Sequence, residues 1–548
     1  MQSSSQIITT RPARFPLALT LACLPFALFF TAACKVGPNF KSPNVTLQAN
    51  WRQHQPSAKS TAAATPEVAW WESFNDPTLN KLIAKAYADN LSLQAAGTSI
   101  LQARAALNQS IGKLFPQDQA LAGGVDYFHI RNPSGTIDGL PLREFLPGLG
   151  SDFASANYLF SASWEIDFWG KYRRGIESSQ ATFYSSIAAY DNALVTLLAD
   201  VANAYINVRT LEQRLIVNQE NVASQEETLN IAQIRFENGE TSDLDVEQAK
   251  TNLAETQSAV PGLKSGLRQA KNGLAILLGI TPDEIDPYLG NSRGIPHPPS
   301  SIAAGIPHDL LRRRPDVREA GLAAAAQSAN IGVAKANLYP SFSLKGAFGF
   351  SSSDIGNSSL DNVFNWNNRI ARANASFLFP IFNYGRLVNE VRIQDAAFQG
   401  SVLNYQNIVL TAQQEVENGL TSFRFGKETA TLLNNATESA NKSTELAVVQ
   451  YKAGAASYTT VLTAQQAALR IDDNLANAQG NTALAAVALY RALGGGWQIR
   501  EGQPVLSESV RNEMAERTNW GNLLEPENEI PADTPKKNRT DDDDSTQP

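Results

Sequence analysis

The sequence has few of the residues on which enzymes and metalloproteins usually depend. Its 548 residues include only four histidines and two cysteines, and the histidines are not spaced as metal ligands. No glycine-rich phosphate loop, nucleophile elbow or H-E-x-x-H motif occurs. No cluster of lysine and arginine recurs on a helical face, and the formal net charge is −8. We therefore predict a protein that is not an enzyme, has no catalytic residues, holds no metal or other cofactor, and does not bind nucleic acid.

Both cysteines, Cys23 and Cys34, lie near the N-terminus. Arg11 and Arg14 precede a nearly unbroken apolar stretch over residues 15–30, and small residues follow before Cys34. A charged start, an apolar middle and a small-residue end are typical of an export signal rather than of a membrane-spanning helix. We therefore expect the mature chain to begin at Cys34.

Removal of residues 1–33 as a lipoprotein signal peptide would leave Cys34 as the only cysteine. An internal disulfide is then excluded, so thioether lipidation is the natural use of the thiol. The alternative is a small residue that happens to lie at a cleavage site. Residue 35 is lysine, not the aspartate that retains similar bacterial lipoproteins in the inner membrane. We expect a lipid anchor at Cys34 in the outer membrane of a Gram-negative bacterium, with the chain extending into the periplasm.

Proline is absent from two long stretches, and the first of them also lacks glycine. Neither glycine nor proline occurs over residues 176–238, and no proline occurs over residues 381–503. We therefore expect long helices over 171–236 and 386–451, each on the order of 100 Å in length. In the first of them apolar residues recur in steps of four and three, which indicates a left-handed coiled coil. These residues are Phe183, Ile187, Tyr190, Leu194, Leu197 and Val201.

The second long stretch repeats the first. Return helices are expected over 243–278 and 459–493, after breaks at Gly239 and Gly454. A single offset of 215 residues relates the two copies, which indicates a tandem duplication. It holds for the pairs Gly170/Gly385, Phe236/Tyr451, Gly239/Gly454 and Val246/Val461.

No apolar run of eighteen or more residues follows Cys34, so no spanning helix is expected. Four segments instead alternate apolar and polar residues, near 117–131, 156–169, 340–350 and 370–382. Strands of about ten residues suit a membrane crossing, whereas a sandwich would bury the apolar face in a core. Four strands cannot close a barrel, and open edges are not tolerated in lipid, so membrane strands would require several subunits to share one barrel.

Glu165 and Asp167 fall on the polar side of the second of these segments. Two carboxylates on one face could serve acid/base chemistry. We instead interpret both as lumen-facing strand residues of a water-filled channel.

The expected fold class is mostly α with a transmembrane β portion, built from a duplicated helix–strand repeat. Each repeat comprises a helix, two strands, a long helix and a return helix. The expected domains are a signal peptide (1–33), an extended equatorial or anchoring segment (34–78), a first repeat (79–279), a proline-rich linker (280–305), a second repeat (306–497) and a polar tail (498–548) that is disordered from about 525.

Several motifs together resemble the outer-membrane efflux channels related to TolC, OprM and NodT. They are C-K-V-G-P-N-F at 34–40, the two helix–glycine–helix repeats, Y-x-x-G-x-x-S-Y-x-x-V-L at 451–462 and A-L-G-G-G-W at 492–497. The resemblance covers nearly everything from Cys34 to Trp497, and its closest branch is the lipoprotein type.

The resemblance implies a homotrimer with a shared twelve-strand β-barrel and a long coiled-coil α-barrel that crosses the periplasm. It also implies partners: a periplasmic membrane-fusion adaptor, an inner-membrane pump of the resistance-nodulation-division class, and outer-membrane lipid. The implied function is the outer-membrane exit duct of a tripartite efflux pump. Such a duct is a passive channel for small toxic compounds and drugs, opened by the adaptor and driven by the pump.

In that family the helix–glycine–helix tips form the closed periplasmic mouth. By resemblance, Asp245 and Tyr451 correspond to gate residues, and Gly239 and Gly454 correspond to the tip glycines. A plainer alternative makes Asp245 a solvated acid in the first turn of a helix, where it favours the helix dipole.

The sequence departs from the family at other gate positions. Ala456 stands where the TolC pattern has arginine, and Thr460 and Thr463 stand where it has aspartates. Gln450 and Gln466 replace arginines of the OprM pattern. We therefore expect hydrogen bonds and packing, rather than a charged ring, to close the mouth.

Two other functions share parts of this pattern. One is the exit duct of a type I protein-secretion system, served by an ABC exporter. The other is a non-transporting lipoprotein that tethers the cell envelope. Alternating strands disfavour the tether, and lipidation with the L-G-G-G-W motif favours small-molecule efflux.

Overall fold

The computed structural model describes residues 35–45, 51–52, 68–129, 136–137, 140–141, 152–290, 294–302, 313–354 and 359–525. The predicted signal peptide, the lipidation site Cys34 and the tail beyond 525 lie outside these ranges. The chain divides into two compact units. Unit 1 combines Met1–Phe40, Ala106–Ser179 and Ala325–Phe398, and unit 2 combines Lys41–Ala105, Gln180–Ala324 and Gln399–Pro548.

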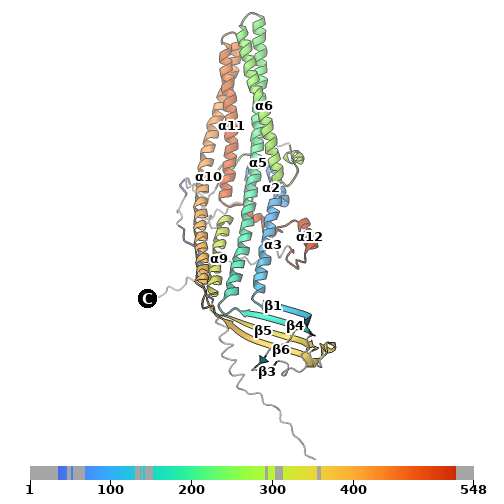
Figure 1. Ribbon diagram of the computed structural model, residues 1–548. Coiled ribbons are helices and arrows are strands. Elements are labelled where there is room, and N and C mark those ends of the chain that lie inside the picture. The colour runs from blue at the N-terminus through green and yellow to red at the C-terminus, as the bar shows by residue number, and fades with distance from the viewer. Residues whose placement is uncertain are drawn as a thin grey trace, which may run out of the picture. The chain divides into compact units, whose positions relative to one another are not determined.

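Four long helices form two antiparallel hairpins, in which α6 returns along α5 and α11 returns along α10 (Figure 1). Their bounds are α5 Lys171–Glu237, α6 Asp243–Leu277, α10 Arg386–Lys452 and α11 Tyr458–Ala492. The first residues of α5 and α10 are 215 positions apart (386 − 171), and so are those of α6 and α11 (458 − 243). The duplication predicted from the sequence is therefore confirmed.

The chain also has shorter elements. The helices α3 (Leu91–Gly112) and α9 (Pro315–Ala336) are a further repeated pair, related by an offset of 224 (315 − 91). The remaining helices are α2 Pro77–Asp89, α7 Ile285–Leu289 and α12 Glu508–Arg517, with 3-10 turns at Trp70–Phe74, Pro282–Glu284, Leu360–Asn362, Trp366–Asn368 and Trp497–Arg500. None of the described helices combines the length and the apolar character needed to cross a membrane.

Each hairpin turns at a glycine whose backbone is left-handed. Gly239 has φ +73° and Gly454 has φ +71°. The N–H of Gly239 donates to the carbonyl of Phe236, and the next N–H donates to the carbonyl of Arg235. Gly454 and the residue after it repeat this pattern. Such paired bonds satisfy the last carbonyls of a helix and require a residue that tolerates positive φ.

Unit 1 contains a four-stranded antiparallel sheet in the order β1-β4-β5-β6. Its strands are β1 Asp118–His129, β4 Asp152–Ile166, β5 Ser341–Ser353 and β6 Arg369–Leu378. A separate two-stranded ladder pairs β2 (Thr136–Ile137) with β3 (Leu140–Pro141). In the four-stranded sheet, β1 and β6 are the edges and the two repeats meet at the β4–β5 pairing.

The two faces of this sheet differ in polarity. One row across all four strands is apolar, running Leu121, Phe160, Phe348 and Ala371. A row three residues away, on the other face, is polar, running Asp118, Ser163, Lys345 and Asn374. Large apolar side chains on the first face are exposed in the single chain, and Leu121 retains 82% of its accessible surface. Such an apolar face requires something outside this chain to cover it.

Two strands end earlier than the sequence predicted. The expected strand near 156–169 ends at Ile166, and the expected strand near 370–382 ends at Leu378. The prediction of Asp167 as a lumen-facing strand residue is therefore wrong, because Asp167 lies beyond β4 and its carboxylate accepts hydrogen bonds from the first turn of α5. Pro380 lacks the N–H that a continued ladder would use.

Aromatic and ionic contacts between buried side chains stabilise unit 2. Trp70 is buried and stacks on Tyr490 of α11, with ring centroids 5.2 Å apart. Arg500, which follows the glycine run near residue 495, is buried and donates two hydrogen bonds to the buried Asp191. Arg318 adds a second cation 3.4 Å from that carboxylate. Part of the predicted polar tail, up to residue 525, is therefore ordered structure against the helices.

Candidate functional site

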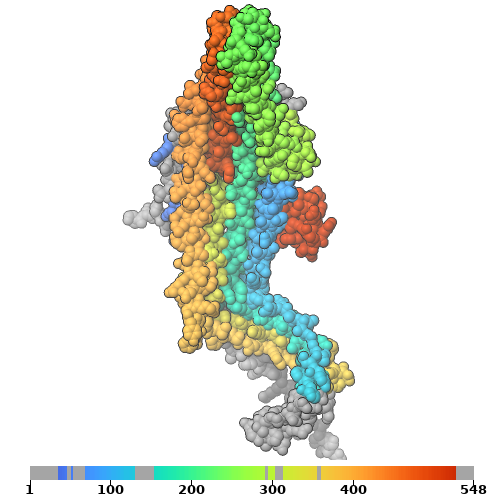
Figure 2. Space-filling model, turned by 45° about the horizontal axis from the view of Figure 1, so that its top comes forward, coloured from blue at the N-terminus to red at the C-terminus, as the bar shows by residue number. Residues whose placement is uncertain are grey.

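The candidate site is the pair of hairpin tips, where the two repeats meet at one end of unit 2. Figure 2 shows the tip of α5 and α6 in green beside the tip of α10 and α11 in orange to red. Seven buried residues from all four helices pack beneath the turns, and they form the tip cluster: Ala232, Val246, Ala249, Ala447, Tyr451, Tyr458 and Val461. Burial of these side chains holds the two hairpins side by side.

One hydrogen bond joins the repeats within this cluster. The hydroxyl of Tyr451, in α10, donates to the Asp245 carboxylate of α6 across 3.3 Å. The hydroxyl of Thr241, in the turn between α5 and α6, donates to the same carboxylate oxygen. Tyr458 meets Tyr451 edge-on, with ring centroids 5.7 Å apart. The two residues predicted as gate residues are thus brought together by the fold.

An arginine completes the tip. The guanidinium of Arg235 lies over the ring of Tyr451, 4.7 Å from its centroid, and its Nε is 3.5 Å from a carboxylate oxygen of Glu240. Such a cation stabilises the ring face electrostatically. A Cβ at Gly454 would meet the Nη2 of Arg235 at 3.4 Å, so the glycine leaves room for this stack.

Burial controls the protonation of both tip tyrosines. It raises the pKa of Tyr458 to about 12, with the neighbouring Tyr451 and Asp245 adding to the effect. Burial also raises the pKa of Tyr451. Both hydroxyls are therefore neutral near pH 7, and Tyr451 acts as a donor to the carboxylate of Asp245.

Thr460 and Thr463 contribute less than predicted within one chain. Both are exposed, and Thr463 donates to the carbonyl of Thr459 in its own helix, 2.8 Å away. The hydroxyl of Thr460 lies 3.4 Å from that of Ser457. Neither threonine contacts the Tyr451–Asp245 pair in any described contact.

Below the tip, further polar contacts join α5 to α11. Gln465 donates to the hydroxyl of Thr228 at 2.9 Å, and both side chains are buried. Deeper along the helices, Arg214 donates two hydrogen bonds to the carboxylate of Asp473, at 2.7 and 3.1 Å. The hairpins are therefore held together by a series of polar contacts along their length.

Sequence reasoning missed several of these residues. Arg235, Thr241 and Tyr458 were not predicted as site residues, because their roles depend on side-chain contacts made at the folded tips. A signal was present, however. Arg235 is the 215-residue counterpart of Gln450, so the tip has an arginine on the first hairpin where the second has glutamine.

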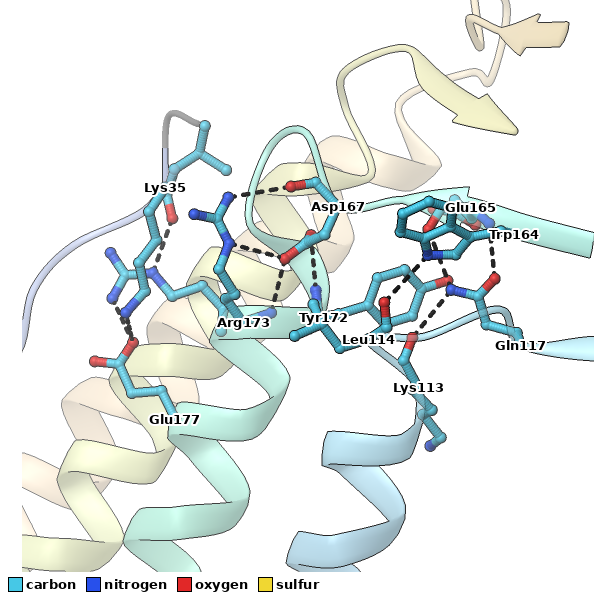
Figure 3. Close-up of polar contacts among 12 residues, drawn as sticks. Lys35, Lys113, Leu114, Gln117, Trp164, Glu165, Asp167, Tyr172, Arg173 and Glu177 are labelled. Carbon is cyan, nitrogen blue, oxygen red and sulfur yellow. Dashed lines mark hydrogen bonds and ion pairs between the residues drawn. The ribbon is translucent and has the colours of Figure 1, made fainter. Parts of the chain in front are cut away.

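In unit 1, Glu165 and Asp167 serve the junction between β4 and α5 (Figure 3). The carboxylate of Glu165 forms an ion pair with the ammonium group of Lys171 at 3.2 Å. Asp167 accepts from the backbone N–H groups of Tyr172 and Arg173 and from the Nε of Arg173, each at 3.0 Å. These bonds fix where the strand ends and the long helix begins.

The segment that begins at Lys35 is held at the same junction. Arg174 is only 1% exposed and donates to the carbonyls of Val36 and Gly37 and to the Oδ1 of Asn39, at 2.9 to 3.1 Å. Figure 3 also shows Lys35 paired with Glu177. The residues that follow Cys34 are therefore fixed beside the start of α5.

Paired helical hairpins joined at their tips, together with a sheet that exposes an apolar face, characterise an outer-membrane export channel. Comparisons with known proteins give the same result. The family model of outer membrane efflux proteins matches residues 82–280 and 306–495. The chain belongs to this family, which confirms the resemblance predicted from the sequence. Its location is accordingly the outer membrane, with the chain extending into the periplasm, as predicted.

Individual relatives match most of the chain. Nodulation protein T of Rhizobium leguminosarum bv. viciae is 31% identical over 484 residues, which cover 87% of this chain and 93% of that protein. The pyoverdine export outer membrane protein OpmQ of Pseudomonas putida is 29% identical over 480 residues, covering 87% and 97%. The outer-membrane channel OprN superposes with a TM-score of 0.76 at 28% identity, covering 85% of this chain and all of that one.

Proposed function

We propose that the protein is the passive exit duct of a tripartite efflux pump for small toxic compounds. The tip cluster carries this proposal. It lies at the ends of two 67-residue helices, where contacts between the two hairpin tips could be kept or broken. At 1.5 Å per residue each helix spans on the order of 100 Å, enough to reach deep into a periplasm. No catalysis is needed for this role, so we assign the protein no enzymatic activity.

Three copies are proposed to share one barrel. The four-stranded sheet has two open edges, β1 and β6, and its exposed apolar face suits contact with lipid. Joining β1 of one copy to β6 of the next would satisfy both edges, and three copies would give twelve strands. The polar face, with Lys345 and Asp118, would then line the lumen.

Closure of the mouth is proposed to depend on the Tyr451–Asp245 hydrogen bond and on packing of the tip cluster. Gly239 and Gly454 permit the sharp turns, while Thr460 and Thr463 remain exposed for contact with another chain. Opening would require α10 and α11 to move relative to α5 and α6. A periplasmic membrane-fusion adaptor that docks on the tips, with a resistance-nodulation-division pump in the inner membrane, would supply the free energy for that movement.

The relatives support this cargo class. OpmQ is named for pyoverdine export, and TtgC of Pseudomonas putida, 28% identical over 496 residues, is named as a probable efflux pump outer membrane protein. The first name describes export of pyoverdine, and the second describes an efflux pump. We also propose that Cys34 is lipidated, because the residues directly after it are fixed at the junction between sheet and helix. An acyl anchor at that position would enter the membrane beside the sheet.

The test is cross-linking in intact cells. A photoreactive residue at Thr460 should capture a membrane-fusion adaptor, identified by mass spectrometry, because this position is exposed at the tip. The same residue at Glu513, exposed on α12, is the matched control and should not capture it. Capture of components of an ABC exporter instead would move the function to protein secretion. Capture of no adaptor from Thr460 would contradict docking at the tips.

A further inference from the structure

Three junctions between a strand and a helix in unit 1 surround a cavity of about 360 Å³, which we term the junction cavity. Its lining comes from the end of β4 and start of α5, from the end of α9 and start of β5, and from the end of β6 and start of α10. A volume of this size is at the lower end of the range that holds small ligands in proteins.

One wall of the junction cavity is aromatic and rigid. Trp169 stacks on Tyr339 with ring centroids 4.6 Å apart and an interplanar angle of 26°, and Phe168 packs edge-on against Trp169 at 4.8 Å. The indole N–H of Trp169 donates to the carbonyl of Pro340 at 2.8 Å, which fixes the ring. Tyr339 remains 41% exposed. This wall offers a flat apolar surface that no side chain of the described chain fully covers.

Two positively charged side chains also line the junction cavity, at equivalent positions of the two repeats. Lys171 begins α5 and Arg386 begins α10, 215 residues apart (386 − 171). Lys171 is paired with Glu165 at 3.2 Å. The counterpart of Glu165 is Pro380 (380 − 165 = 215), so the second repeat lacks the acid. Among the described residues, Arg386 has no ion-pair partner.

The remaining acid of the lining does not cancel the charge of Arg386. The carboxylate of Asp167 accepts three hydrogen bonds, from the backbone of Tyr172 and from the backbone and side chain of Arg173. Its side chain is only 7% exposed. The cavity therefore has an excess positive charge at Arg386 next to an aromatic wall.

We propose that the junction cavity binds an anionic amphiphile, with its acidic group on the guanidinium of Arg386 and its apolar body on the Trp169–Tyr339 stack. Arginine binds carboxylates and related acids through charge-assisted, often bidentate, hydrogen bonds. A membrane lipid and an exported organic acid share this chemistry. The exported acid as source rests on the proposed efflux function, whereas binding itself does not.

The test is calorimetric titration of the purified full-length protein in uncharged maltoside micelles, with naphthoate as the probe and naphthamide as its uncharged analogue. One naphthoate should bind per chain, and more tightly than naphthamide. Arg386→Gln should weaken naphthoate binding at least about tenfold, with little effect on naphthamide. Tyr339→Leu should weaken both probes, because it removes half of the aromatic stack.

The matched control is Arg392→Gln, which removes an exposed arginine of the same helix that bonds Asn389 and does not line the cavity. It should bind naphthoate as the wild type does. Equal naphthoate affinity in the wild type and the Arg386→Gln variant, or no binding to the wild type, would overturn the proposal.

Phosphatidylglycerol added to the micelles distinguishes the two sources. Competition with naphthoate would support the site and assign it to lipid, whereas undisturbed binding would support it as a contact for exported acids. Failure of naphthoate binding, with an adaptor still captured from Thr460, would reject the site and leave the proposed function intact.

Discussion

The hydroxyl of Tyr451 and the carboxylate of Asp245 come from different repeats, yet they lie 3.3 Å apart in a half-buried setting. A neutral phenol is required for this bond, because a phenolate would repel the carboxylate. Burial keeps the phenols neutral by raising the pKa of both tip tyrosines. The contact between the two hairpin tips therefore depends on side chains that stay protonated near pH 7.

This protonation predicts loss of tip stability in strong alkali. The pKa of Tyr458 rises from its ordinary value of 10 to about 12 on folding, so the folded state binds this proton more tightly than the unfolded state. Its contribution to stability is complete below pH 10 and disappears as the pH rises to about 12. The ultraviolet absorbance of tyrosinate measures this ionisation.

In the Tyr458→Phe variant, the absorbance step near pH 12 should shrink by one tyrosine relative to the wild type. A step of equal size in both proteins, or ionisation of this residue near pH 10, would show that Tyr458 is not buried at the tip.

Arg174 gives a second prediction for a single side chain. Arg174→Met keeps an unbranched apolar stem of similar length to that of arginine but removes the guanidinium that donates to Val36, Gly37 and Asn39. We expect a loss of about 3 kcal/mol in the free energy of unfolding, because the hydrogen bonds of a buried guanidinium to partly buried acceptors are lost. Trypsin should then cleave faster after Lys35 and Lys41.

Lys113→Met, which removes an exposed cation near the same junction, is the control for this experiment. Unchanged cleavage and stability in Arg174→Met would mean that the N-terminal segment is not held by this arginine.

Glycines in the long helices differ in whether a larger side chain would fit in their place. A Cβ at Gly480 of α11 would overlap the hydroxyl of Thr210 on α5, whereas a Cβ at Gly262 of α6 would meet nothing within 4 Å. We expect Gly480→Ala to destabilise the protein by about 1–3 kcal/mol through overpacking. Gly262→Ala should stabilise it by about 0.5–1 kcal/mol through helix propensity.

Urea unfolding of both variants measures this difference. Equal midpoints for Gly480→Ala and Gly262→Ala would contradict the close approach of α5 and α11.

Helices were more predictable from the sequence than strand ends. The lack of proline, and in most of the first stretch also of glycine, indicated helices over 171–236 and 386–451, and the structure has 171–237 and 386–452. Strand ends were missed because alternation continues into Asp167, which the structure uses to cap α5 instead. Periodicity reports which face a residue occupies, but it does not report a competing hydrogen bond from the next element.

Gate residues were found only in part, for a similar reason. Asp245 and Tyr451 follow from the repeat and the family pattern. Arg235 becomes important only when the two hairpins lie together, because its stack on Tyr451 crosses between them. Thr241 was also missed, although its hydrogen bond to Asp245 spans only four residues. The 215-residue offset could have indicated Arg235, since its counterpart Gln450 was already noted as a departure from the family.

The chain as a whole is incomplete by itself. Its sheet has unpaired edges at β1 and β6, and its apolar face is exposed in the single chain. Both features are expected of a subunit that completes a shared structure in a membrane. The duplicated hairpins pack against each other at their tips through the tip cluster. Together they predict a channel whose conductance is limited by the tips.

Single-channel recording in planar lipid bilayers tests this claim most directly. The purified wild-type protein should insert and conduct only weakly. Asp245→Ala should assemble normally but raise the conductance, because Tyr451 and Thr241 lose their acceptor. Asp243→Ala, which removes an exposed acid from the same helical turn, should behave as the wild type. Equal conductance in the wild type and Asp245→Ala would remove Asp245 from the gate, and no channel events in any of the three proteins would contradict the duct itself.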